Sequence, residues 1–396
     1  MDSAKADVRE SGALPMALTG AQRARYARHL SLPEVGERGQ QRLLAARVLC
    51  VGAGGLGSPI AMYLAAAGVG TIGIIDSDVV DESNLQRQVI HGQSRIGVPK
   101  VFSAAAVIAE LNPGVDVIAH ERELTSDNAR ELFASYDLIV DGTDTFATRY
   151  LINDACVLLG KPFVFASVLR FGGQVMTVLP GRSACYRCAF PEPPLPGTVP
   201  TCEQAGVFGA MCGVIGSYEA VEAIKLITGV GEPLTNRMMR VDALTMNTEI
   251  LAIPADPQCA VCGESPTITG LIDYPAWCGT KHTSSNDDVT ALQLQGELAA
   301  RDAGANDFVL IDVREPFETQ ICAIDGALHI PQGLLADNDG IRTIAKDTRI
   351  VVMCLAGVRS AAACDYLRGE GFLSVHNLAG GIRSWIDDVD PSLTRY

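Results

Sequence analysis

The chain has 396 residues, of which 48% are hydrophobic, and this length predicts two or three domains with sizeable cores. Its formal net charge is −15, from 31 basic and 46 acidic residues, which argues against a nucleic-acid partner because phosphate binding needs a basic face. No apolar run reaches the ~20 residues that a membrane span needs. Residues 1–17 lack the pattern of a secretory signal and are predicted to be a disordered leader. Twelve cysteines without a signal peptide predict a reducing, cytoplasmic setting in which they bind metal or act in catalysis.

Two helical patterns follow over residues 18–46, and the first of them carries Arg28. Arginines on such a short helix usually face solvent. Arg28 could instead reach into the nucleotide site of a neighbouring subunit, and the sequence leaves both interpretations open.

A glycine-rich turn in RVLCVGAGGLGS is the strongest single motif. A strand-forming apolar run stops at Gly52, Gly54 and Gly55, and a helical pattern follows at once. Such a turn lets backbone N–H groups approach a polyphosphate at the start of a helix. A second strand ends in Asp76, about 20 residues on, where a carboxylate can reach a ribose hydroxyl. We therefore expect a nucleotide here rather than a tight turn without ligand, although the motif does not separate NAD from ATP.

Two cations lie on the polar segment that follows, together with an amide side chain. They are Arg87 and Lys100, with Asn84 close before them. An enzyme that cleaves ATP uses such cations to neutralise the phosphates and the leaving group, whereas a nicotinamide enzyme does not need them. The alternative is a surface loop with ordinary salt bridges.

A later strand, residues 136–140, ends in Asp141 and is followed closely by Asp144. Carboxylates at strand ends face the ligand crevice of an open α/β sheet, so Asp144 is a candidate for Mg²⁺ or the nucleotide. Asp141 could equally be the cap of a turn. The helix before this strand, over 126–133, is expected to begin with Ser126 or Asp127 as its cap.

Two C-x-x-C pairs predict a tetrahedral zinc site of the structural kind, closed by four thiolates. The pairs are Cys185 with Cys188, and Cys259 with Cys262. Two redox pairs, or a chance pattern, are the alternatives. Between the pairs, a proline-rich segment predicts a crossover loop that carries an exposed Cys202.

Residues 266–287 turn polar and predict a linker, after which residues 288–396 form a small α/β domain of their own. Its third strand runs directly into Cys354, followed by Arg359 and a helix. Backbone amides at a strand-to-helix turn stabilise an anionic sulfur, and Arg359 adds positive charge. We expect a thiolate that carries sulfur. The alternative is a buried cysteine at a strand end.

These motifs resemble two known families joined in one chain. GAGGLG, SNLQRQ and the paired C-x-x-C make residues 18–265 similar to MoeB and ThiF, bacterial relatives of ubiquitin-activating enzymes. The loop C-x-x-G-x-R-S makes residues 288–396 similar to a rhodanese domain. The fused arrangement resembles the MoeZ-like adenylyltransferase–sulfurtransferases. The resemblance implies a Rossmann-like doubly wound α/β sheet with a structural four-cysteine zinc site, and a C-terminal rhodanese α/β domain.

The resemblance also implies an activity. Such enzymes use ATP to adenylate the C-terminal glycine of a ubiquitin-like sulfur carrier that ends in Gly-Gly, and a rhodanese persulfide then turns the adenylate into a thiocarboxylate. The sulfur donor would be thiosulfate or a cysteine desulfurase, the enzyme a homodimer, and molybdenum cofactor biosynthesis one of several possible pathways. In this resemblance the nucleotide is bound by Gly55 and Asp76, the phosphates by Asn84, Arg87 and Lys100, Mg²⁺ by Asp144, and Zn²⁺ by Cys185, Cys188, Cys259 and Cys262. Arg28 comes from the partner subunit, Cys354 holds the persulfide, and Cys202 frees the product by attacking an acyl-disulfide.

The sequence departs from the family at two places. Thr145 follows Asp144 where an asparagine is usual, and Leu355 and Ala356 replace a frequent Lys-Thr after Cys354. Two rival functions stay open: a nicotinamide-dependent oxidoreductase, and an adenylyltransferase whose rhodanese domain only docks a partner.

Overall fold

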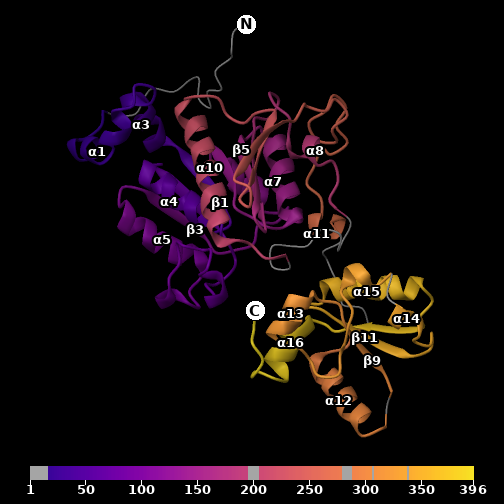
Figure 1. Ribbon diagram of the computed structural model, residues 1–396. Coiled ribbons are helices and arrows are strands. Elements are labelled where there is room, and N and C mark those ends of the chain that lie inside the picture. The colour runs from indigo at the N-terminus through magenta and orange to yellow at the C-terminus, as the bar shows by residue number, and fades with distance from the viewer. Residues whose placement is uncertain (1–16, 195–204, 279–287, 306, 337–338) are drawn as a thin grey trace. The chain divides into compact units, whose positions relative to one another are not determined.

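The computed structural model describes residues 17–194, 205–278, 288–305, 307–336 and 339–396. Figure 1 shows two compact units, each with its own sheet and helices. The first contains the described residues to Pro193 and from 205 to Trp277, and the second contains Pro194 and the described residues from Cys278 onward. The predicted leader, apart from residue 17, and Cys202 lie outside the described residues.

The first unit is built on an eight-stranded sheet with the order β3-β2-β1-β4-β5-β6-β7-β8. Its strands are β1 Arg47–Val51, β2 Thr71–Ile75, β3 Asp116–His120, β4 Leu138–Asp141, β5 Phe163–Leu169, β6 Gly172–Val178, β7 Arg237–Asp242 and β8 Asn247–Ala252. The strands from β3 to β5 pair in parallel and the remainder antiparallel. Because the chain moves outward from β1 in both directions, the crevice of a doubly wound sheet lies at the ends of β1 and β4.

Helices cover this sheet on both faces. They are α1 Gly20–Arg25, α2 Ala27–Leu30, α3 Gly36–Ala45, α4 Gly57–Ala67, α5 Lys100–Leu111, α6 Ala129–Ala134, α7 Phe146–Leu159, α8 Tyr186–Ala189, α10 Gly209–Thr228 and α11 Tyr274–Trp277, with short 3-10 turns at Glu82–Asn84 and Gln93–Arg95. Helix α4 contacts α5 and α10, whereas α7 contacts α6, α8 and α11. Figure 1 shows α4, α5 and α10 as one group and α7, α8 and α11 as another, with the strands between them.

One helix end illustrates the role of glycine, and another corrects a prediction. Helix α4 ends at Gly68, whose φ of 83° suits glycine, and a Cβ there would lie 2.5 Å from the ring of Tyr26. The expected cap of α6, Ser126 or Asp127, is wrong: the helix begins at Ala129 rather than at residue 126, with Asn128 as its N-cap and no side-chain hydrogen bond to the first turn.

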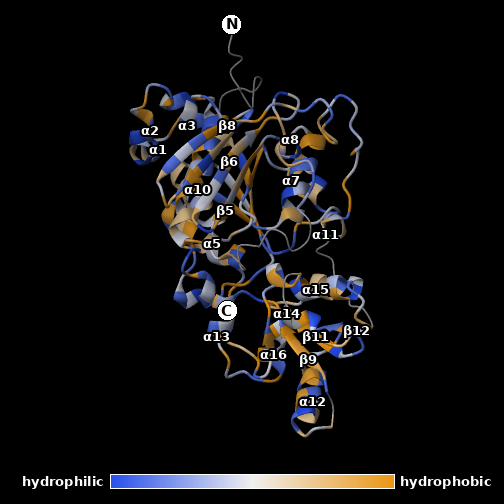
Figure 2. Cartoon of the chain, turned by 45° about the vertical axis from the view of Figure 1, so that its right-hand side comes forward, coloured by the Kyte–Doolittle hydropathy of each residue, from blue (hydrophilic) through white to orange (hydrophobic). Residues whose placement is uncertain are grey.

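The second unit has a four-stranded parallel sheet with the order β10-β9-β11-β12. Its elements are α12 Ala291–Asp302, β9 Val309–Asp312, α13 Pro316–Ile321, β10 Leu328–His329, a 3-10 turn Gln332–Leu334, α14 Asp339–Arg342, β11 Arg349–Met353, α15 Val358–Gly369, β12 Ser374–Asn377 and α16 Gly381–Asp388. Apolar clusters lie on both faces of this sheet. Figure 2 accordingly shows β9 and β11 as hydrophobic strands inside the unit.

The predicted linker contains a short helix, α11, which packs against α7. The hydroxyl of Tyr274 donates to Asp154 at 2.7 Å, and both side chains are fully buried. None of the described helices is long and apolar enough to cross a membrane.

Candidate functional site

A cavity of about 260 Å³ opens where β1 ends in the glycine turn. Gly52 has a φ of 95°, and a Cβ on Gly57 would lie 2.1 Å from the carbonyl oxygen of Gly52, so glycine is required at both positions. The predicted nucleotide residues that line this cavity are Gly52, Gly54, Gly55, Asp76, Asn84, Arg87, Lys100 and Asp144. The structure therefore brings together, around one cavity, residues that come from separate stretches of the chain.

The acidic strand end is tied to the glycine turn. Oδ2 of Asp76 accepts the backbone N–H of Ala53 at 2.8 Å, and its Oδ1 accepts that of Asp78. Lys100 is buried, and its Nζ donates to Oδ2 of the exposed Asp78 at 2.8 Å. Arg87 is half-buried, and its Nη1 donates to the backbone carbonyl of Ser83. Two cations thus face a cavity beside a carboxylate, an arrangement that suits a polyphosphate.

The two aspartates after β4 have different surroundings. Asp144 is exposed to the cavity. Asp141 is buried, and its Oδ1 accepts the N–H and hydroxyl of Thr143, so it caps the turn, the second of its two interpretations. Burial raises the pKa of Asp141 to about 6, against the opposing effect of Arg149. Thr145, the departure from the family, serves as the N-cap of α7.

Arg28 lies exposed on α2 and is not among the residues that line this cavity. Within the described chain, therefore, it does not contribute to the nucleotide site of its own subunit. The prediction that it acts from a partner subunit stays a prediction.

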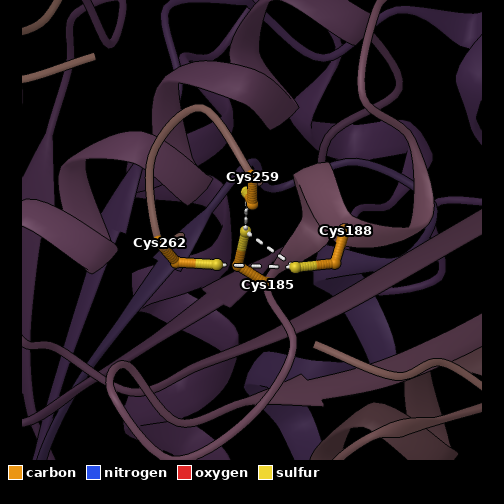
Figure 3. A group of neighbouring side chains, drawn as sticks. All are labelled: Cys185, Cys188, Cys259 and Cys262. Carbon is orange, nitrogen blue, oxygen red and sulfur yellow. Dashed lines mark hydrogen bonds between the residues drawn. The ribbon is translucent and has the colours of Figure 1, made fainter. Parts of the chain in front are cut away.

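The four predicted zinc ligands meet in one cluster, with sulfur atoms all within 4.8 Å of one another (Figure 3). The Cys185–Cys259, Cys188–Cys262 and Cys185–Cys188 sulfur pairs are 3.6, 3.4 and 3.9 Å apart. Zinc–sulfur bonds of about 2.3 Å in a tetrahedron place sulfurs ~3.8 Å apart, so the four thiols fit a zinc ion. The other three cysteine sulfurs, together with burial, raise the pKa of Cys185 far above its ordinary value. A bound cation would lower this pKa again, because it stabilises the thiolate.

One of the two residues between Cys185 and Cys188, Arg187, is held in place by its neighbours. Arg187 is 2% exposed and forms two hydrogen bonds of 2.8 Å with Asp154, which is 0% exposed. Its guanidinium carbon lies 4.7 Å from the ring centre of Tyr150 and 4.5 Å from that of Trp277. The cysteine cluster and α11 are thereby attached to the same point on α7.

In the second unit, Cys354 lies at the turn from β11 into α15. Its sulfur accepts the N–H of Gly357 at 3.1 Å and lies 3.2 Å from the hydroxyl of Ser360. The carbonyl of Cys354 accepts the N–H of Ile382, at the start of α16. Gly357 has a φ of 90°, which suits glycine, and a Cβ there would lie 3.1 Å from the backbone nitrogen of Gly380. Of the amide donors that the sequence predicts around this sulfur, the described contacts include one, the N–H of Gly357, with the Ser360 hydroxyl as a second donor.

The cation beside Cys354 is neutralised within the unit. Arg359 is buried, and its Nη1 and Nη2 donate to the two carboxylate oxygens of Glu318 at 2.6 and 2.7 Å. Burial alone would raise the pKa of Glu318, but the hydrogen bonds from Arg359 hold this pKa below its usual range. The hydroxyl of Tyr396 donates to Glu318 at 3.3 Å and accepts from Arg314 at 2.6 Å. Arg359 therefore belongs to a fixed network.

Sequence reasoning missed three residues of these sites. Arg149 and Gln88 line the nucleotide cavity, and Glu318 pairs with Arg359. Gln88 closes the SNLQRQ motif and Arg149 follows Asp144 by five positions, so motif context alone could have nominated both. Only the fold reveals Glu318, because its partner is 41 residues away.

Comparison with known proteins gives a consistent result. The ThiF family matches residues 26–261, and the rhodanese-like domain matches residues 294–388. The chain is 46% identical to the "Probable adenylyltransferase/sulfurtransferase MoeZ" of Mycobacterium tuberculosis, over 96% of this chain and 97% of that protein. It is 39% identical to the "Adenylyltransferase and sulfurtransferase MOCS3" of Bos taurus, over 96% and 89% respectively.

A crystal structure of E. coli MccB with MccA-N7isoASN has a TM-score of 0.55 at 22% identity, covering 61% of this chain and 75% of that chain, which supports the fold alone. The resemblance to MoeZ-like proteins and the predicted fold class, a Rossmann-like sheet with a C-terminal rhodanese domain, are confirmed. The chain belongs to the ThiF family and carries a C-terminal rhodanese-like domain.

Proposed function

We propose that this chain is an adenylyltransferase and sulfurtransferase that activates the C-terminal glycine of a ubiquitin-like sulfur carrier and converts it into a thiocarboxylate. The observation that carries this proposal is the nucleotide cavity, in which a glycine turn, Arg87, Lys100 and Asp144 face the same space. The near full-length similarity to proteins named for both activities supports it.

In the first step, the carboxylate of the carrier attacks the α-phosphorus of ATP, and pyrophosphate leaves. Gly52, Gly54 and Gly55 accommodate the phosphates, and Asp76 binds the ribose. Asn84, Arg87 and Lys100 stabilise the charge that develops on the leaving group. Asp144 would hold a Mg²⁺ ion, whose charge neutralises the phosphates when it is bound.

In the second step, the outer sulfur of a Cys354 persulfide attacks the acyl carbon, and AMP leaves. The amide of Gly357 and the hydroxyl of Ser360 stabilise the anionic sulfur, while Arg359 stays paired with Glu318. The resulting acyl-disulfide is then attacked by the thiolate of Cys202, which releases the thiocarboxylate and leaves a Cys202–Cys354 disulfide for a thiol reductant. Cys202 lies outside the described residues.

The organisation of the enzyme forms part of the proposal. The adenylation domain spans residues 18–265, a linker 266–287, and the rhodanese domain 288–396. Cys185, Cys188, Cys259 and Cys262 hold a structural Zn²⁺ ion, which closes the cluster and leaves no position for catalytic water. The enzyme acts as a cytoplasmic homodimer, in which Arg28 enters the partner's site. Thiosulfate or a cysteine desulfurase supplies sulfur, and molybdenum cofactor biosynthesis is one candidate pathway.

Two measurements test the proposal with recombinant carriers that end in Gly-Gly. Pyrophosphate exchange into ATP should depend on the carrier and on Lys100. Intact mass should show the exchange of one oxygen for sulfur at the carrier terminus, and the variant Cys354→Ser should lose this mass change but keep pyrophosphate exchange. Thiocarboxylate formation that survives in Cys354→Ser would mean that the second unit only docks a partner. NAD-dependent absorbance changes without pyrophosphate exchange would instead support the oxidoreductase.

A further inference from the structure

Gln88 is a buried polar side chain in the nucleotide cavity, and none of the roles proposed above uses it. It is 4% exposed and lines the cavity. Its Oε1 has no hydrogen-bond partner among the described residues. Since buried polar atoms in folded proteins are almost always satisfied, an atom of this kind at a cavity indicates a bound ligand or its water.

The position of Gln88 is fixed by its neighbours. Its backbone N–H donates to the carbonyl of Asn84 at 2.9 Å, and its carbonyl accepts the N–H of His91 at 3.0 Å. The ring of His91 is held in turn, with Nδ1 2.9 Å from the hydroxyl of Ser103 and Nε2 2.8 Å from the carbonyl oxygen of Ala53. Because Ala53 belongs to the glycine turn, these contacts fix the backbone of Gln88 relative to that turn.

The side chain also points toward the turn. Nε2 of Gln88 lies 3.7 Å from the point where a Cβ on Gly54 would stand. The stem of Arg87 lies 3.6 Å from the corresponding point on Gly55. The point on Gly55 lies closer still, at 2.8 Å, to the sulfur of Cys212, so the space beside Gly54 is the one that Gln88 faces. An amide N–H there is a neutral donor for a phosphate oxygen.

We propose that Gln88 is a positioning residue of the adenylation reaction, which donates an Nε2 hydrogen to an oxygen of the nucleotide's phosphate chain at the glycine turn. Its Oε1 accepts from water bound with that ligand. This inference rests on the proposed function, because the ligand is the nucleoside triphosphate. Arg87 and Lys100 supply charge, whereas Gln88 supplies a donor of fixed direction.

Gln86 provides a matched control. It lies two positions earlier in the same motif, is exposed, and does not line the cavity. The variants are Gln88→Met and Gln88→Glu, compared with Gln86→Met and Gln86→Glu in the full-length chain. The measurement is equilibrium binding of a non-hydrolysable ATP analogue, without carrier, at two pH values.

We expect Gln88→Met to weaken binding about tenfold, the value of one hydrogen bond to a charged group. Gln88→Glu should weaken it further at about pH 8, where a carboxylate would face phosphate, and recover partly at about pH 5, near the ordinary glutamate pKa of about 4.3, since a protonated carboxyl is again a donor. Both Gln86 variants should bind as the wild type does at both pH values.

Two results would overturn the inference. One is wild-type affinity in both Gln88 variants. The other is an equal loss for Gln88→Glu at both pH values with a lowered melting temperature, which would indicate a purely structural role. A wild-type chain that does not bind the analogue at all would instead refute the proposed function itself, so the two failures are distinguishable.

Discussion

Replacing Asp141 by asparagine should stabilise the first unit at neutral pH. The carboxylate is 1% exposed at the end of β4, and its Oδ2 has no hydrogen-bond partner among the described residues. Burial raises its pKa from an ordinary 3.8 to about 6. Because the folded state binds the proton more tightly than the unfolded state, this group adds stability below pH 3.8, and the stability is lost as the pH rises through 6.

The magnitude follows from the shift. At 1.36 kcal/mol per pKa unit, ionised Asp141 costs the folded state about 3 kcal/mol at pH 7. An asparagine at this position would keep the acceptor for Thr143 and carry no charge. Asp141→Asn should therefore be more stable than the wild type by up to about 3 kcal/mol at pH 7 and by only about 1 kcal/mol at pH 4.5.

Fluorescence offers an assay specific for this unit. The chain has two tryptophans, and the background variant Trp385→Phe leaves only Trp277, which lies in the first unit. Urea titrations at both pH values would then compare Asp141→Asn with Asp116→Asn, the same change at an exposed position of β3, for which the effect should stay within about 0.5 kcal/mol. A variant less stable than its parent at pH 7, or a difference independent of pH, would refute the reasoning.

Three further changes have expected outcomes. Cys262→Ser should lower the zinc content measured by atomic absorption and alter Trp277 emission; unchanged zinc content would exclude the four-cysteine site. Asp154→Asn leaves a charged Arg187 buried and should cost about 3–5 kcal/mol in urea unfolding, whereas Glu37→Gln, in an exposed pair with Arg23, should cost under about 1 kcal/mol; equal losses would contradict the role of burial. Leu64→Ala, at a fully buried position of α4, should lower the free energy of unfolding by about 2–5 kcal/mol in urea titration. A smaller loss would show that neighbouring side chains fill the space that the leucine leaves.

Features that depend on neighbouring residues were predictable from the sequence. The glycine turn after β1, the two C-x-x-C pairs and the loop from Cys354 to Arg359 each carry their chemistry within a few positions. Their geometry follows from backbone rules such as the positive φ that glycine permits, so the fold class and much of the candidate site were foreseen.

Tertiary structure alone decided which distant groups meet. Asp154 pairs with Arg187 across 33 residues and Glu318 with Arg359 across 41. Neither Asp154 nor Glu318 stands out in the sequence, because any surface position can carry a carboxylate. The same holds for Asp141, whose two interpretations were separated only by its burial and its bonds to Thr143. A sequence sets which residues are adjacent along the backbone, but desolvation and pairing depend on what packs around each side chain, and that is determined only when the sheet and its helices close over it.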